Sequence, residues 1–321
     1  MQNAFQNSIS TGYVTPSTLA AALIAAKPTR AVRIVGAACG IGARDQGCAD
    51  GPVAMRRLKL DQALRHRDMP VSWHATVKPA PHQHEAAEPL ERARNFLEDL
   101  SNRLIPIAHR REHFLVLGGD HSCAIGTWTA AAVTLESQGT LGLIWIDAHM
   151  DSHTPETSIS GALHGMPLAA LLGYGDQRLI DLIAPGPKVS PEHVCLVGVR
   201  SYEAGEYELL KRLGVRVIFM QEVNRIGLGA ALSEALAITG RGTAGFGVSV
   251  DLDAIDPQDA PGVGTPEPGG IGSQELLECM ALIAAHKQDL VGLEIAELNP
   301  ARDRDGVTAK LVYALCQRVF Q

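Results

Sequence analysis

Acidic and imidazole side chains follow short apolar runs at three places in the sequence. The three places supply six candidate metal ligands, which are His121, Asp147, His149, Asp151, Asp251 and Asp253. Clustered carboxylates repel one another and are costly to desolvate unless a cation compensates their charge. We therefore expect these six side chains to form a metal centre.

The types and number of these donors indicate which metal would bind. Four carboxylates and two imidazoles, with no cysteine, suit Mn²⁺, and Fe²⁺, Co²⁺ or Ni²⁺ are alternatives on ligand type. Residues two apart in a strand end point the same way, so Asp147, His149 and Asp151 should face one side, as should Asp251 and Asp253. Six ligands exceed what one catalytic ion needs, so we expect two ions, roughly 3.5 to 4 Å apart, that share carboxylates.

The elements that must position these ligands alternate between strand and helix. Nearly continuous apolar runs predict buried parallel strands over 31–37, 114–117, 141–146, 194–199, 215–220, 248–252 and 290–295. Helical patterns lie between most of them, over 85–104, 163–172, 203–213, 228–239, 273–286 and 307–319. This alternation predicts an α/β fold.

The predicted strands also bring the ligand segments together. His121 follows the run 114–117, Asp147 closes 141–146 and Asp251 closes 248–252. In open parallel sheets, ligands gather beyond the carboxyl ends of the strands. No linker or internal repeat divides the chain, so we expect a single domain over residues 1–321, with 1–30 as an N-terminal extension and 78–88 as a surface loop.

Composition and charge exclude several classes of protein. The 321 residues include 28 basic and 35 acidic side chains, a formal net charge of −7 without a basic run, which argues against nucleic acid or anionic membranes as partners. No segment resembles a signal peptide or a membrane span, so we expect a cytoplasmic protein. Six widely spaced cysteines without a C-x-x-C pair indicate free thiols in a reducing compartment.

The three ligand motifs resemble a known family. The segments 118–122 (Gly-Gly-Asp-His-Ser), 147–151 (Asp-Ala-His-Met-Asp) and 249–257 (Ser-Val-Asp-Leu-Asp-Ala-Ile-Asp-Pro) are similar to the signatures of the ureohydrolases, the arginase and agmatinase family. The similarity extends from about Ile34 to the C-terminus. It implies a three-layer α/β/α fold with a largely parallel eight-stranded sheet, hydrolysis of a guanidino compound to urea and an amine, and a homo-oligomer, either a trimer or a hexamer.

The resemblance also implies how two Mn²⁺ ions would be held to activate a water molecule. One ion would be bound by His121, Asp147, Asp151 and Asp251, and the other by Asp147, His149, Asp251 and Asp253. Asp147 and Asp251 would therefore bridge the two ions.

Further residues receive roles from the same resemblance. Glu297 is similar to the family's guanidinium-facing Glu, and His164, in Ser-Gly-Ala-Leu-His-Gly, matches its acid/base or proton-shuttle His. We include Asp151 with these two in the catalytic group, and we expect Thr265 to line the pocket from a Gly-Thr-Pro loop. Asp120 and Asp256 are expected either to orient the ligands or to cap turns.

The substrate-facing segments resemble those of arginases more than those of agmatinases. Ser158 and Ser160 occupy the hydroxyl positions that hold a substrate α-carboxylate, and Glu203 and Glu206 the acidic positions that contact an α-amino group. Since acids are also favoured at helix starts, a capping role for both is an open alternative. His153 stands where arginases place an Asn that meets the carboxylate; it could donate to that carboxylate or close the pocket around a smaller compound.

Three readings of the function follow. We expect L-arginine as the substrate, hydrolysed to L-ornithine and urea, with guanidinobutyrate, guanidinopropionate, agmatine or guanidine as alternatives. A single-zinc amide deacetylase of related fold would need fewer ligands than the six present. A non-catalytic partner subunit should have lost a ligand, and none is missing.

Overall fold

Eight parallel strands form one sheet at the centre of the computed structural model, which describes residues 30–65, 69–80 and 88–321. Their order across the sheet is β2-β1-β3-β8-β7-β4-β5-β6. The strands are β1 (Val32–Ala37), β2 (Val71–Val77), β3 (His113–Gly118), β4 (Leu141–Ile146), β5 (Val194–Val199), β6 (Arg216–Phe219), β7 (Gly245–Asp251) and β8 (Leu290–Ala296). All seven neighbouring pairs run parallel, so the predicted α/β fold with a parallel eight-stranded sheet is confirmed.

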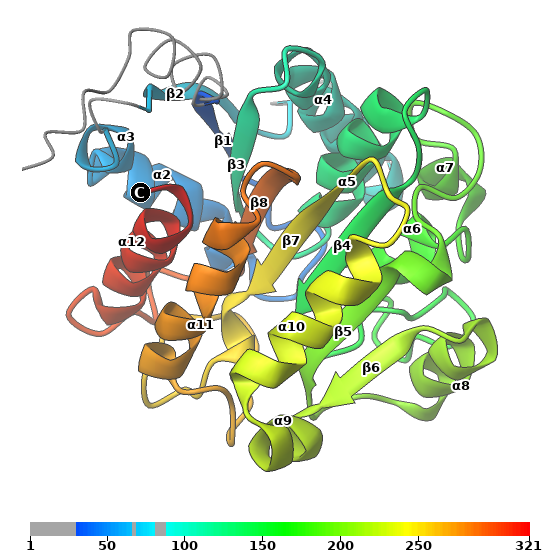
Figure 1. The fold of residues 1–321 in the computed structure, drawn as a ribbon. Coiled ribbons are helices and arrows are strands. Elements are labelled where there is room, and N and C mark those ends of the chain that lie inside the picture. Colours follow the sequence, from blue (N-terminus) through cyan, green and yellow to red (C-terminus); the bar gives the residue numbers. More distant parts are fainter. Residues whose placement is uncertain (1–29, 66–68, 81–87) are drawn as a thin grey trace, which may run out of the picture.

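Helices cover both faces of this sheet. Figure 1 shows α10 and α11 crossing one face, with α12 beside them. The helices are α2 (Gly51–Arg57), α3 (Leu60–Ala63), α4 (Pro89–His109), α5 (Cys123–Leu135), α6 (Pro167–Leu171), α7 (Gln177–Ile180), α8 (Ala204–Leu213), α9 (Met220–Ile226), α10 (Leu228–Thr239), α11 (Ser273–Ala285) and α12 (Val307–Phe320). Short 3₁₀ turns are η1 (Gln46–Asp50), η2 (Leu163–Gly165), η3 (Pro191–His193) and η4 (Leu252–Ala254).

The central strands are buried on both sides, which explains their unbroken apolar sequences. In β4, Ile144 and Ile146 belong to the core that α10, α11 and α12 cover. Leu143 and Trp145 point the other way, into the core that α4 and α5 cover. Successive residues of a strand face opposite sides, so a strand between two helical layers must be apolar throughout.

Strand β2 and helices α2, α3, α5, α7 and α9 were not predicted from the sequence. Strand β2 lies at the sheet edge and pairs with β1 alone; only its end residues, Val71 and Val77, are buried, and its sequence has no continuous apolar run. Helix α5 is buried almost all round, and a helix without a polar face shows no amphipathic period. The helix predicted over 163–172 is wrong as a single element, because the 3₁₀ turn η2 and the short helix α6 divide that range.

Some expectations fall on residues outside the described part of the chain. These are most of the predicted N-terminal extension and residues 81–87 of the predicted surface loop. Among the described residues, no helix combines the length and the apolar character that crossing a membrane requires.

Candidate metal centre and catalytic site

Four adjacent strands bring the candidate ligands to one edge of the sheet. Strands β3, β8, β7 and β4 are neighbours in that order, and their carboxyl ends lie side by side because all run parallel. His121 comes three residues after β3, Asp147 directly after β4, and Asp251 ends β7. The predicted convergence of sequence-distant ligands is therefore observed.

His121 lies at the centre of three carboxylates. Its Nδ1 atom is 3.1 Å from Asp147 Oδ2, 3.0 Å from Asp151 Oδ2 and 3.0 Å from Asp251 Oδ2. The imidazole stacks on Trp145, with 4.4 Å between ring centroids. His121, Asp147 and Asp251 form one compact, buried ligand group, which Asp151 adjoins through its contact with His121.

His149 forms a second group with two carboxylates. Its Nδ1 atom lies 3.1 Å from Asp253 Oδ2 and 3.5 Å from Asp147 Oδ1. Asp147 thus directs one oxygen to each group, as a carboxylate shared between two ions would. Five of the six predicted ligands belong to the two groups, and the sixth, Asp151, contacts His121.

The two-residue spacing of the ligands was predicted to reflect the alternation of side chains along a strand. The structure shows a different cause. Asp147, His149 and Asp151 follow β4 rather than extending it, and Asp253 lies in the 3₁₀ turn η4. The Asp147 carboxylate accepts a hydrogen bond from the backbone N–H of His149 at 2.7 Å, and the Asp251 carboxylate accepts one from Asp253 at 2.8 Å. Carboxylate-capped turns, not strand alternation, bring these ligands together.

Neighbouring side chains hold the ligands in position. The Trp145 indole donates to Asp147 Oδ2 at 2.8 Å, and the Thr265 hydroxyl donates to Asp253 Oδ2 at 3.0 Å. Thr265 therefore contacts a candidate ligand. Trp145 was not predicted as a site residue, although an indole two residues before a ligand Asp is a usable signal.

A buried chain of polar groups fixes the far side of His121. Ser249 Oγ lies 2.9 Å from His121 Nε2 and donates to Glu294 Oε1 at 2.9 Å. Glu294 is fully buried in β8, and the sequence analysis missed it. An acid inside an otherwise apolar strand was its only signal. Such outer contacts select the nitrogen that a histidine presents to a metal.

The electrostatics of this cluster fit a bound cation. Burial, together with the charges of Asp253 and Asp147, raises the pKa of Asp251 well above its ordinary value. Burial and the charge of Asp147 raise the pKa of Asp151 to about 6. His121 Nδ1 is buried, aims at three carboxylates and has no well-formed hydrogen bond. A divalent ion between these atoms would relieve the repulsion and complete the coordination of the imidazole.

Glu297 connects the metal centre to His164. Its Oε1 atom accepts a hydrogen bond from the His121 backbone N–H at 2.9 Å and lies 3.2 Å from His164 Nδ1. Its Oε2 atom lies 3.0 Å from the thiol of Cys48, a buried residue to which the sequence analysis gave no role. Glu297 and Asp151 have positive φ angles of 68° and 48°, a costly backbone conformation that clusters at functional sites.

Asp120 and Asp256 act as turn residues. Asp120 accepts from the backbone of Gly42 and from Ser122, and Asp256 accepts from the backbones of Gln258, Gly269 and Gly270. Neither carboxylate forms a hydrogen bond to one of the six ligands in the described structure. Of the two roles expected for them, the structure shows turn capping.

Five residues expected to meet the substrate lie on the loop after Asp151 and at the start of α8, and we call them the rim: His153, Ser158, Ser160, Glu203 and Glu206. His153 is buried and contacts Glu203, while Glu206 is buried under the start of α8. The Ser158 and Ser160 hydroxyls accept hydrogen bonds from the backbones of Gly161 and Ala162, within one exposed loop. A cavity of about 530 Å³ borders this loop, and its lining includes Ser160.

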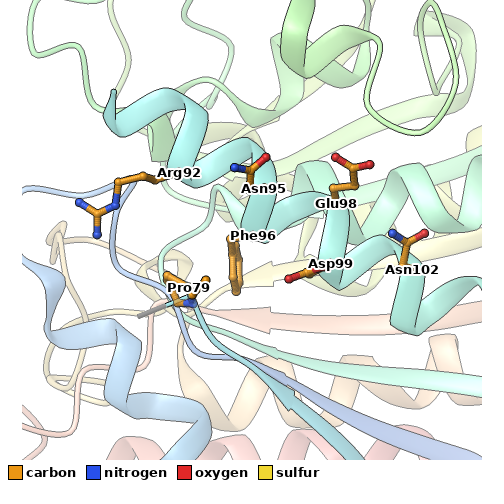
Figure 2. A pocket seen from close by; sticks show the side chains of 8 residues that line it. Pro79, Arg92, Asn95, Phe96, Glu98, Asp99 and Asn102 are labelled. Carbon is orange, nitrogen blue, oxygen red and sulfur yellow. The ribbon is translucent and has the colours of Figure 1, made fainter. Parts of the chain in front are cut away.

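A separate hollow lies on the outer surface of α4. The cavity measures about 270 Å³, and side chains of α4, among them Asn95, Phe96 and Asp99, face Pro79 across it (Figure 2). No candidate ligand lines it, and neither does His164 or Glu297. Its lining offers no thiol or imidazole, so we assign it no chemistry.

Comparisons with known proteins agree with this geometry. The Arginase family model matches residues 30–321. The arginase of Bacillus caldovelox is 38% identical over 297 residues, which are 90% of this chain and 97% of the relative. The crystal structure of arginase from Bacillus cereus superposes with a TM-score of 0.82 at 34% identity, covering 91% of this chain and 98% of that one. Entamoeba histolytica arginase in complex with L-ornithine gives a TM-score of 0.79 at 27% identity, with 91% and 98% covered.

The family model spans nearly the whole described chain, and the relatives are covered almost completely. The chain therefore belongs to the arginase family and is a metal-dependent hydrolase of C–N bonds in linear amidines.

Proposed function

We propose that this protein hydrolyses L-arginine to L-ornithine and urea. The observation that carries the proposal is the convergence of six candidate metal ligands next to the contact between buried Glu297 and half-buried His164. The arginase names of the relatives support the choice of substrate. Retention of every ligand argues against a non-catalytic partner subunit.

The two ligand groups would hold a pair of Mn²⁺ ions, with Ni²⁺, Co²⁺ or Fe²⁺ as alternatives of similar donor preference. His121, Asp147, Asp151 and Asp251 would bind one ion, and Asp147, His149, Asp251 and Asp253 the other. Two such ions lower the pKa of bound water and thereby supply a nucleophile near neutral pH.

Glu297 is the carboxylate placed to orient the guanidinium group. It lies beside the ligands and is 1% exposed, and a carboxylate pairs well with a planar guanidinium cation. Its backbone N–H donates to the Gly119 carbonyl at 2.8 Å, which fixes where the side chain begins. Glu297 would thus present the guanidinium carbon to the nucleophile.

His164 is placed to protonate the departing amine. When water adds to the guanidinium carbon and the C–N bond breaks, the leaving nitrogen needs a proton. Burial lowers the pKa of His164, but its contact with Glu297 outweighs burial and raises that pKa to about 9. Nδ1 faces Glu297, so Nε2 is the nitrogen that would transfer the proton.

The rim residues would select the amino-acid end of the substrate. Ser158 and Ser160 would hold the α-carboxylate, while the acids of α8 would meet the α-ammonium group. We also propose that the protein assembles as a homo-oligomer, a trimer or a hexamer, and works in the cytoplasm. Light scattering of the purified protein would give the number of subunits.

A panel of guanidino compounds tests the substrate assignment. Metal-loaded protein is given L-arginine, agmatine, guanidinobutyrate, guanidinopropionate and guanidine, and urea release is followed. We expect the highest kcat/KM with L-arginine and a poor rate with agmatine, because agmatine has no carboxylate for Ser158 and Ser160. If another compound of the panel gives a higher kcat/KM, that compound becomes the assigned substrate in place of L-arginine.

A further inference from the structure

His153 is held by contacts at its backbone and at both ring nitrogens. Its backbone N–H donates to the carbonyl of Gly165, the residue after His164, at 2.9 Å. The ring Nδ1 lies 3.1 Å from Thr157 Oγ1, and Nε2 lies 2.7 Å from Glu203 Oε2. The short Nε2 contact requires an N–H donor, because a carboxylate only accepts. Neither ring nitrogen is therefore free to bind a substrate carboxylate.

The two acids near His153 have different environments. Glu206 is 2% exposed, and its oxygens accept the backbone N–H groups of Ser152 at 3.1 Å and Glu203 at 3.0 Å. The Glu203 side chain is 60% exposed. Each oxygen of a carboxylate can accept more than one hydrogen bond. Glu206 is thus enclosed, with its Oε2 also 3.4 Å from His153 Nε2, whereas the more exposed Glu203 can still receive a ligand.

The surrounding backbone keeps Glu203 close to the rim. Glu203 and Glu206 form a reciprocal capping box at the start of α8. Thr157 packs on the first turn of the same helix, so closely that a Cβ at Gly205 would lie 2.7 Å from its Cβ. Helix α8 and the loop that carries Ser158 are therefore docked together, with His153 between them.

We propose that His153 is a positioning residue that fixes Glu203 to receive the α-ammonium group of the substrate. This inference rests on the proposed function and revises the expectation that His153 itself meets the carboxylate. Without the imidazole, the Glu203 carboxylate would keep only its contact with the backbone N–H of Glu206, and the ammonium group would have to order it further on binding. This ordering weakens substrate binding and leaves the reacting centre unchanged. Loss of the imidazole should therefore raise KM and leave kcat nearly unchanged.

Compounds that lack one end of arginine separate the two roles. L-Arginine carries both α-groups, and 5-guanidinopentanoate carries the carboxylate without the α-amino group. A residue that acts through Glu203 affects only L-arginine. A residue that binds the carboxylate affects both compounds equally.

The test compares kcat and KM of His153→Ala with both substrates. We expect kcat/KM for L-arginine to fall about tenfold, mainly through KM, the size expected when one charge-assisted hydrogen bond is lost. We expect less than about a twofold change with 5-guanidinopentanoate, since its binding does not use Glu203. His153→Gln, whose amide reaches the Nε2 position, should recover most of the loss, whereas His153→Asn is too short.

Two controls complete the design. Ser158→Ala, on the carboxylate side, should weaken both substrates alike, and His286→Ala, an exposed histidine at the end of α11, should change neither. Equal losses of His153→Ala with both substrates, or a loss in kcat alone, would overturn the proposal.

Failure of the proposed function would be seen separately. In that case the wild type would release no urea from L-arginine. The role of His153 would then be tested by measuring ligand binding instead of turnover. Calorimetry would compare L-ornithine with 5-aminopentanoate, which lacks the α-amino group. His153→Ala should weaken L-ornithine alone, and equal weakening of both compounds would refute the role of His153.

Discussion

Glu297 Oε1 lies 3.2 Å from His164 Nδ1, and the same oxygen accepts a hydrogen bond from the backbone of the candidate ligand His121. One carboxylate oxygen thus joins the candidate proton donor to the metal centre. The arrangement separates two tasks, since the ring of His164 has its polar contact with Glu297 and His121 has contacts with three ligand carboxylates.

The first prediction concerns His164 itself. His164→Ala should lower kcat for urea release roughly 10²- to 10⁴-fold, the usual contribution of a positioned acid or base. Bound metal, measured by plasma mass spectrometry after dialysis, should remain at the wild-type level. His121→Ala is the matched comparison and should reduce bound metal. Metal loss in the His164 variant would contradict the assignment of His164 as a proton donor that does not hold the metal.

The second prediction follows from the raised pKa of His164. Burial alone would lower this pKa, but the contact with Glu297 raises it from 6.5 to about 9 in the folded protein. Protonated His164 therefore contributes stability that is fully present below pH 6.5 and is lost as pH rises through about 9.

Thermal unfolding of chelator-treated protein measures this pH-dependent contribution of His164 to stability. The wild type should be more stable than His164→Gln at about pH 6, by roughly 2 kcal/mol, and the difference should shrink towards pH 10. A difference that grows with pH would contradict the assignment.

The third prediction concerns the polar chain behind His121. Ser249→Ala and Glu294→Gln should each weaken metal binding by about 10- to 100-fold, because the imidazole loses the contacts that orient it. Metal affinity can be measured by competition with a chelator of known strength. Glu234→Gln, in a partly exposed ion pair with Arg216, serves as the control. Unchanged affinity in both Ser249 and Glu294 variants would show that the chain does not support the metal centre.

The fourth prediction tests the packing of the sheet that holds the ligands. A methyl group added at Gly247, in β7, would overlap the buried ring of Trp128. Gly247→Ala should therefore lower the free energy of unfolding by about 1 to 3 kcal/mol, as overpacking of a core does. Gly272→Ala has open space around the added methyl and should change it little. Equal stabilities of the two variants would show that the sheet accommodates the extra methyl.

Much of the fold and of the metal centre could be predicted from the sequence, because both depend on strong local patterns. Buried strands such as β4 are apolar throughout, and the ligands follow those strands directly. Helix α10 was predicted with its observed ends, since its sequence carries a clear helical pattern. Edge strand β2 and the enclosed helix α5 lack such patterns.

The rest of the site depends on contacts between residues far apart in the chain. Cys48 and Glu297 meet across 249 positions, and Ser249 and Glu294 across 45. His153 was expected either to donate to the carboxylate or to close the pocket, and its contact with Glu203, 50 residues away, was not predicted. Side-chain direction is set by packing, which sequence spacing alone does not specify.

The most direct test of the central claim is urea release from L-arginine by purified, Mn²⁺-loaded protein. Urea and L-ornithine should appear in equal amounts, and the reaction should stop when a chelator removes the metal and return when Mn²⁺ is restored. Absence of urea from metal-loaded, folded protein, or a rate that a chelator leaves unchanged, would contradict the assignment of this site as a metal-dependent arginine hydrolase.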